Sequence, residues 1–123
     1  MNGVLTAEQL MEGCPPSIEK TMMWHGRAVK VKKTLTLSEY IDFIYSALDA
    51  CLNKETNTYR LEILDFVFRV NVVTRYAKAE LPEDLEDQYR VLYETDLYNV
   101  IMTYINADQV DSLYRTVRMY MRI

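Results

Sequence analysis

The segment from residue 59 to residue 79 constrains the fold more than any other part of the sequence, because it is the most apolar stretch of the chain. Its apolar residues would cover most of the circumference of a helix, leaving a narrow polar strip of Glu62, Asp65 and Arg69. A helix that is apolar on nearly every side is normally buried among other elements. The segment therefore predicts a central helix, with Asp65 and Arg69 paired one turn apart.

One part of this segment is locally unfavourable for a helix. Val70, Val72 and Val73 are β-branched, and such side chains lose rotamer freedom in a helix. A break in the helix at this point is therefore an open alternative. Asn71 lies among the valines, and we expect its amide to be hydrogen-bonded locally, because buried polar groups are normally paired.

A capping box predicts a helix before this segment. Thr36 is followed three residues later by Glu39, the arrangement in which each side chain bonds the other residue's backbone N–H. A polar loop over residues 53–58 follows the helix. The residues with helical spacing that form its apolar stripe are Leu37, Tyr40, Ile41, Ile44, Leu48, Cys51 and Leu52.

Three more helices are expected after the central one. Pro82 interrupts the apolar pattern and suits the first turn of a new helix. Thr95 is a candidate cap for the next helix, and Asn106 with Gln109 predicts a second, Asn-type capping box that opens the last one. The helix capped by Thr95 would carry Leu97, Ile101, Tyr104 and Ile105.

The pattern before these helices predicts a β-hairpin over residues 18–33. Residues 27–33 alternate in strand periodicity, and residues 18–24 precede them. His25-Gly26 lies between the two runs, and a two-residue loop containing glycine fits a tight primed turn.

Residues 1–17 are expected to form a flexible N-terminal arm. Thr6 can cap a short helix there, which Gly13 and the Pro15-Pro16 pair would end. Residues 18–123 then form a single globular domain, whose helical body covers residues 36–121. The predicted fold is mainly α, with about five helices and a small N-terminal β-hairpin, and thus α+β at the margin.

Charge and hydropathy exclude several classes of protein. The formal net charge of the 123 residues is −4, which makes direct nucleic-acid binding an unfavourable interpretation. No apolar run approaches the ~20 residues of a membrane-spanning helix, and the first residues lack a signal-peptide pattern. We therefore expect a soluble protein with no membrane partner.

Side chains for catalysis are scarce. The two cysteines, Cys14 and Cys51, form no ligand cluster and are expected to be free thiols. His25 is the only histidine, and three glycines leave no phosphate-binding loop. We predict no catalytic residue, no cofactor and no metal site, and hence a protein that is not an enzyme.

Two charged segments are candidate partner-binding surfaces. The basic strand could dock an acidic partner, although edge lysines also protect sheets against aggregation. The acids of residues 80–96 could bind the basic strand of a second copy in a head-to-tail contact, or they could mimic nucleic-acid phosphate. Their structural role would be to stabilise helix N-termini. The acids are Glu80, Glu83, Asp84, Glu86, Asp87, Glu94 and Asp96.

Ten tyrosines and one tryptophan add an aromatic signal typical of protein interfaces. The tyrosines assigned to the core or its rim are Tyr40, Tyr89, Tyr104 and Tyr114. Those that are harder to place inside are Tyr45, Tyr93, Tyr98 and Tyr120. The complete set of candidate partner-binding residues is Trp24, Arg27, Lys30, Lys32, Lys33, Glu83, Asp84, Glu86, Asp87, Tyr93, Tyr98 and Tyr120.

Taken in order, several stretches between about residues 20 and 110 resemble small proteins encoded among the structural genes of tailed bacteriophages and prophages. A short hairpin followed by a helical body is also similar in layout to phage tail assembly chaperones. The resemblance implies no catalytic or ligand-binding residue. The stretches that carry it are residues 24–26, 29–39, 65–73, 76–77, 81–82 and 88–96.

The sequence thus leads to a functional hypothesis with one alternative. The first is a non-enzymatic phage protein that acts by protein–protein contact, as a tail assembly factor or minor virion component. Its partners would be phage structural proteins or a second copy, in the cytoplasm of the bacterial host or in the virion. The alternative is a phage-encoded inhibitor of a host enzyme or defence system that uses the acidic surface.

Overall fold

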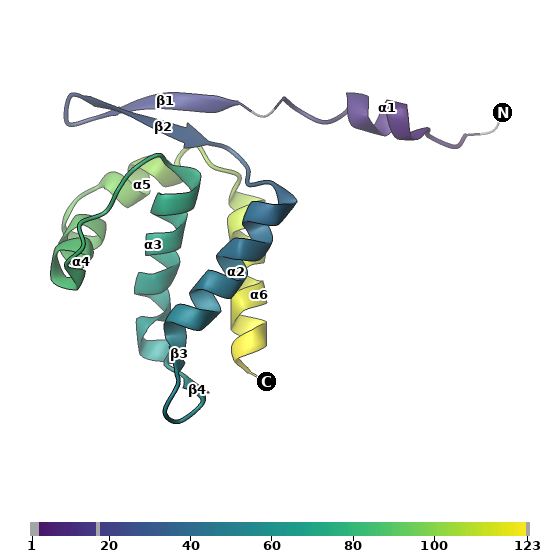
Figure 1. Ribbon diagram of the computed structural model, residues 1–123. Helices are drawn as coiled ribbons and strands as arrows, with labels where there is room; N and C mark the ends of the chain where they lie inside the picture. Colours follow the sequence, from purple (N-terminus) through teal and green to yellow (C-terminus); the bar gives the residue numbers. More distant parts are fainter. Residues whose placement is uncertain (1–2, 17, 123) are drawn as a thin grey trace.

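The computed structural model describes residues 3–16 and 18–122 and is mainly helical, with a small hairpin near the N-terminus (Figure 1). This confirms the predicted fold class. The elements are α1 (Ala7–Glu12), β1 (Glu19–Trp24), β2 (Arg27–Lys32), α2 (Leu37–Cys51), β3 (Leu52–Asn53), β4 (Thr58–Tyr59), the 3₁₀ turn η1 (Leu61–Ile63), α3 (Leu64–Tyr76), α4 (Leu85–Glu94), α5 (Leu97–Met102) and α6 (Ala107–Met121).

Helix α3 is central, as predicted, and packs against α2, α4 and α5. It is shorter than the apolar segment, because Tyr59 ends β4, residues 61–63 form η1, and residues 77–79 lie beyond the end of the helix. It is not broken at the valines. Phe66 and Val70 are half-buried, so one side of α3 is incompletely covered. Its buried side chains are Leu64, Val67, Phe68, Asn71, Val72, Val73 and Tyr76.

The core-facing side of α2 differs from the predicted apolar stripe. Leu37 and Ile41 are 76% and 43% exposed, whereas Phe43 and Ala47 are fully buried. The exposed side chains at successive turns of α2 are those of Leu37, Ile41 and Tyr45. The helix is rotated because α3 and α6 cover the side that carries Phe43.

The hairpin is confirmed and lies across one end of the helical body (Figure 1). His25 and Gly26 have φ values of 49° and 75°, as a primed turn requires. The inward face of β2 ends at Val31, which is fully buried and bridges to Ala77 beyond α3. This pairing is what draws residues 77–79 out of the helix.

The two capping boxes have different outcomes. Thr36 and Glu39 bond each other's backbone N–H at 3.2 and 2.9 Å, as predicted. Asn106 caps α6 by accepting from the Gln109 N–H at 3.1 Å. The predicted bond from the Gln109 side chain back to the Asn106 N–H is wrong. The Gln109 amide instead accepts from the Leu35 N–H at 2.8 Å and donates to the Leu35 carbonyl at 3.1 Å.

The starts of α4 and α5 also differ from the prediction. Pro82 precedes α4, whose cap is Asp84, and the Gln88 amide donates to the Pro82 carbonyl at 2.7 Å. Asp96, not Thr95, occupies the cap of α5, although the Thr95 hydroxyl accepts from the Leu97 N–H at 3.3 Å. Helix α5 ends at Met102, before Tyr104 and Ile105.

The loop over residues 53–58 contains a second small sheet that was not predicted. Strands β3 and β4 pair antiparallel, with Asn53 opposite Thr58. The Asn53 side chain accepts from the Glu55 N–H at 3.0 Å, and Asn57 has a φ of 57°. Asparagine at both places supplies this turn chemistry, which a purely polar composition does not reveal.

The arm contains the short helix that was predicted. Thr6 and Gln9 form its capping box, and Gly13 is its C-cap. Residues 3–16 are all exposed, and the arm extends away from the helical body (Figure 1). Residues 1, 2 and 17 of the predicted arm lie outside the described residues. No helix of the described part is long and apolar enough to cross a membrane.

Candidate protein-binding groove

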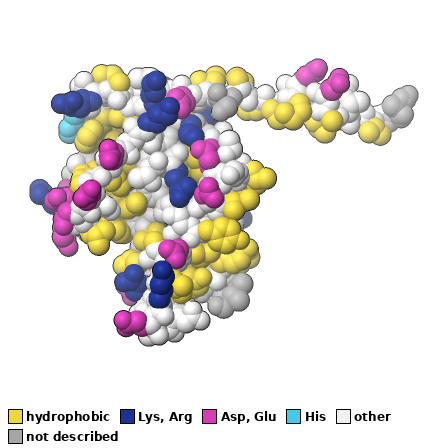
Figure 2. Space-filling model, in the orientation of Figure 1, with side chains coloured by type: hydrophobic (Ala, Val, Ile, Leu, Met, Phe, Trp, Pro, Cys, Tyr) yellow, Lys and Arg dark blue, Asp and Glu magenta, His cyan; other side chains and the backbone are white. Residues whose placement is uncertain are grey.

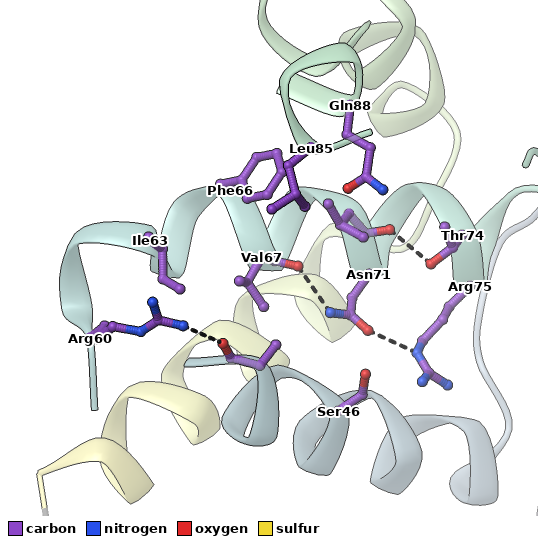
Figure 3. A pocket seen from close by; sticks show the side chains of 12 residues that line it. Ser46, Arg60, Ile63, Phe66, Val67, Asn71, Thr74, Arg75, Leu85 and Gln88 are labelled. Carbon is purple, nitrogen blue, oxygen red and sulfur yellow. Dashed lines mark hydrogen bonds between the residues drawn. The ribbon is translucent and has the colours of Figure 1, made fainter. Parts of the chain in front are cut away.

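An open groove of about 660 Å³ runs along the uncovered side of α3 (Figure 3). Helix α2 forms one wall, and α4 borders the opposite side. Exposed apolar surface in a concave site is typical of a binding surface. The floor consists of Ile63, Phe66, Val67, Val70 and Leu85.

The groove depends on small side chains in α2. Ser46 and Ala50 lie one turn apart on the wall. Neither is large enough to cover Phe66 or Val70 completely, and both stay only half-buried. A leucine at either wall position would be expected to fill this space and bury the floor.

Arginine lies at both ends of the groove, as Figure 3 shows. Asn71 is buried and donates to the Val67 carbonyl at 2.9 Å, which confirms the expectation of a local hydrogen bond. Its carbonyl oxygen accepts from Arg75 Nε at 3.0 Å and holds that guanidinium at one end. Arg60 donates to the Ala50 carbonyl at 3.4 Å at the other end. No acidic residue is among the described residues that line the groove.

The apolar surface continues over α4 into a smaller hollow of about 340 Å³. Leu85 and Tyr89 are 67% and 49% exposed there, so Tyr89 does not belong to the core rim as predicted. Phe66 lies beside Tyr89, with 6.4 Å between ring centroids. Glu62 and Glu86 line this hollow, so it is acidic where the groove is basic.

Two of the predicted interface tyrosines enclose Arg69. Its guanidinium carbon lies 4.4 Å from the Tyr93 ring centroid and 4.5 Å from that of Tyr98. Asp65 accepts from Arg69 Nε at 3.1 Å, which confirms the predicted pair, and also from the Tyr93 hydroxyl. Burial, followed by the bond to Asp65, raises the pKa of Tyr93. Both tyrosines are half-buried and contact Arg69 of the same chain.

The candidate residues of the hairpin divide into two groups. Trp24 is half-buried, and its indole N–H donates to Asp96 at 2.8 Å. Lys32 forms an ion pair with Glu39 at 2.5 Å. The hairpin and the end of the acidic segment thus meet within one chain. The basic residues that remain exposed are Arg27, Lys30 and Lys33.

The Lys32–Glu39 pair predicts an acid-sensitive step in stability. The Lys32 hydrogen bond, followed by the Thr36 N–H, lowers the pKa of Glu39 below its usual 4.5. A depressed pKa stabilises the fold above the unfolded-state pKa, and this stabilisation is lost as the pH falls through the folded-state value. Because both side chains are partly exposed, we expect a loss of only about 0.5–1 kcal/mol.

Urea unfolding of the wild type and Glu39→Gln at about pH 6 and about pH 3 measures this step. Glutamine keeps an oxygen for the Thr36 N–H but does not titrate. We expect the difference in unfolding free energy between the two chains to shrink at the lower pH. A difference that does not change with pH would contradict the assignment.

The other candidate residues lie on exposed surface. The acids Glu83, Asp84, Glu86 and Asp87 surround the start of α4. Asp84 is the cap of that helix and accepts from the Asp87 N–H at 3.1 Å. Tyr120 is 45% exposed near the end of α6. The space-filling view shows charged side chains spread over the face rather than gathered at one place (Figure 2).

The groove itself was missed by sequence reasoning. Phe66 and Val70 lie in the apolar segment that predicted a buried central helix. The available signal was the pair of small residues, Ser46 and Ala50, on one side of α2. Such a pair is informative only when it is known which helix lies opposite.

The side chains considered above for catalysis are His25, Cys14 and Cys51. His25 is exposed and stacks on Trp24, with ring centroids 4.1 Å apart. Cys51 is buried, which raises its pKa, and Cys14 is exposed. Within residues 3–16 and 18–122, no three metal-ligating side chains lie together. Comparisons with protein-family models, curated proteins and solved structures found no match to this chain.

Proposed function

We propose that this chain is a non-enzymatic phage protein that binds other protein chains through the groove, as a tail assembly factor or a minor virion component. The groove between α2, α3 and α4 is the observation that supports protein binding. The phage assignment rests on the sequence resemblance over residues 20–110. On this proposal the protein works in the host cytoplasm or remains in the virion.

The shape and chemistry of the groove suit a helical segment of a partner. An amphipathic helix docks its apolar face into an apolar groove and leaves its polar face in solvent. Phe66 and Leu85 provide apolar contacts, and Arg60 and Arg75 provide charged ends. Aromatic residues and arginine are enriched in such interfaces.

The proposal is tested by capturing a tagged chain from infected cells and identifying its partners by mass spectrometry. Ala50→Trp places a large side chain on the exposed groove wall. We expect the wild type to recover tail or capsid proteins and Ala50→Trp to recover at least about tenfold less. Circular dichroism should show unchanged folding, because position 50 is exposed.

Asp49→Trp is the matched control, since this neighbouring residue is exposed and does not line the groove. It should recover the same proteins as the wild type. Equal recovery by Ala50→Trp would overturn the role of the groove. Recovery of a stoichiometric host enzyme in place of virion proteins would support the inhibitor alternative, in which the acids around α4 are the binding surface.

A further inference from the structure

We propose that the groove of one copy holds the N-terminal arm, residues 3–16, of a second copy. This inference rests on the proposed function, because it assigns an occupant to the same groove. The occupant is a segment of known sequence rather than an unidentified partner. The contact would link successive copies of the chain.

The arm carries apolar side chains that nothing in the described chain covers. Every residue from 3 to 16 is exposed. The space-filling view shows apolar side chains along one side of the arm and the acidic ones along the other (Figure 2). The arm is therefore amphipathic, as a groove-binding segment must be. Its large exposed apolar residues are Val4, Leu5, Leu10 and Met11, each more than half exposed.

Helix α1 has the local signals of a helix but lacks packing. Its six residues have a complete capping box of Thr6 and Gln9. Isolated helices shorter than about 12 residues are marginal in water, and most helical stability in proteins comes from packing. A capped helix this short is therefore suited to becoming fully stable on a partner surface.

The charges of the two surfaces are complementary. The described arm contains Glu8 and Glu12 and no basic residue. The groove is lined by Arg60 and Arg75 and by no acidic residue. The adjoining hollow carries acids and would repel the arm, so complementarity confines it to the groove.

The dimensions also agree. At 1.5 Å per residue, α1 is about 9 Å long, and the stretch of α3 from Phe66 to Thr74 that lines the groove extends about 12 Å. The helix thus fits within the floor, and Val4 and Leu5 reach beyond its first turn. Leu10 and Met11 are the natural anchors, because they are in the helix and exposed.

The stem of the arm favours a second copy over the chain's own groove. Pro15 and Pro16 fix their φ angles and keep the stem extended, which opposes the turn needed to fold back. The arm leaves β1 pointing away from the helical body (Figure 1). An arm bound by the next copy leaves one groove and one arm free, so the contact propagates into rings or filaments.

Two variants test the inference, one with a defective arm and one with a blocked groove. Leu10→Glu with Met11→Glu removes the anchors of the arm, and Ala50→Trp blocks the groove. All three positions are exposed, so both variants should fold. We expect the wild type to self-associate in sedimentation velocity and each variant alone to be monomeric. Mixed, they should form 1:1 heterodimers, because one intact arm meets one intact groove.

A labelled peptide of residues 3–16 provides an independent measurement. It should bind the full-length Leu10→Glu, Met11→Glu variant, whose groove is intact, and adding Ala50→Trp should weaken binding at least about tenfold, whereas adding Asp49→Trp should not. Monomeric wild type with no heterodimer on mixing would overturn the inference, including the case in which the arm binds its own groove. An unbound peptide would also overturn it.

These results are distinguishable from failure of the proposed function. If the chain stays monomeric but Ala50→Trp loses captured tail or capsid proteins, the inference is overturned and the proposed function stands. If the heterodimer forms but no virion protein is captured, protein binding by the groove stands with the inference, and the role in tail assembly or in the virion is overturned.

Discussion

Replacing Phe43 by alanine is expected to lower the free energy of unfolding by about 4 kcal/mol. Phe43 is fully buried, and its ring meets Phe68 edge-on, with centroids 5.1 Å apart. Phe68 meets Tyr114 in the same way at 5.1 Å. These three rings join α2, α3 and α6, so truncation of Phe43 leaves a cavity between helices.

Urea unfolding followed by circular dichroism measures this loss, and Tyr45→Ala is the matched control. Tyr45 is an aromatic residue on the same helix but is 63% exposed, so its truncation should cost less than about 0.5 kcal/mol. A domain of this size is stabilised by about 6–18 kcal/mol in total. Similar losses for both variants would contradict the assignment of Phe43 to the core.

Gln109→Ala is expected to lower the free energy of unfolding by about 3 kcal/mol. Its amide bonds the N–H and carbonyl of Leu35 and accepts from the Tyr76 hydroxyl at 2.6 Å. Leu35 and Tyr76 are buried, so alanine would leave their polar groups without these partners. Burial, the largest cause, raises the pKa of the Tyr76 hydroxyl.

The same unfolding experiment tests Gln109, with Gln88→Ala as control. Gln88 makes one amide hydrogen bond, to the Pro82 carbonyl, so its loss should cost only about 1 kcal/mol. If the two glutamine variants lose equal stability, Gln109 does not join α6 to Leu35 and Tyr76 as the structure indicates.

The groove has a consequence for how the chain combines stability and binding. Phe43 is fully buried, whereas Ala50, two turns further along nearly the same side of α2, is exposed on the groove wall. Variants at the wall positions can therefore change binding without changing the core. This separation is why Ala50→Trp is informative about partners and Phe43→Ala about folding.

Local signals in the sequence predicted several elements correctly. The hairpin followed from strand alternation around His25-Gly26, and both helices opened by threonine capping boxes begin where expected. Each signal involves residues within about four positions of one another. Turn and cap geometry depend on backbone and side-chain bonds at that range, so the sequence is sufficient.

Predictions about longer distances were less accurate for a physical reason. Gln109 has the spacing of a capping box, but the buried polar groups of Leu35 lie within its reach and bind its amide instead. Val31 pairs with Ala77 and ends the extension of α3. In both cases a contact between residues far apart in sequence competes with a local preference and prevails.

The sequence by itself determined the hairpin, the helical character of the body and the central position of α3. Only the tertiary structure decided that Leu37 and Ile41 face solvent and that Ser46 and Ala50 leave α3 uncovered. Periodicity shows that a helix has an apolar side, but not how much of that side its neighbours cover. Coverage depends on the sizes of side chains that meet across helices, and the groove is the space they leave.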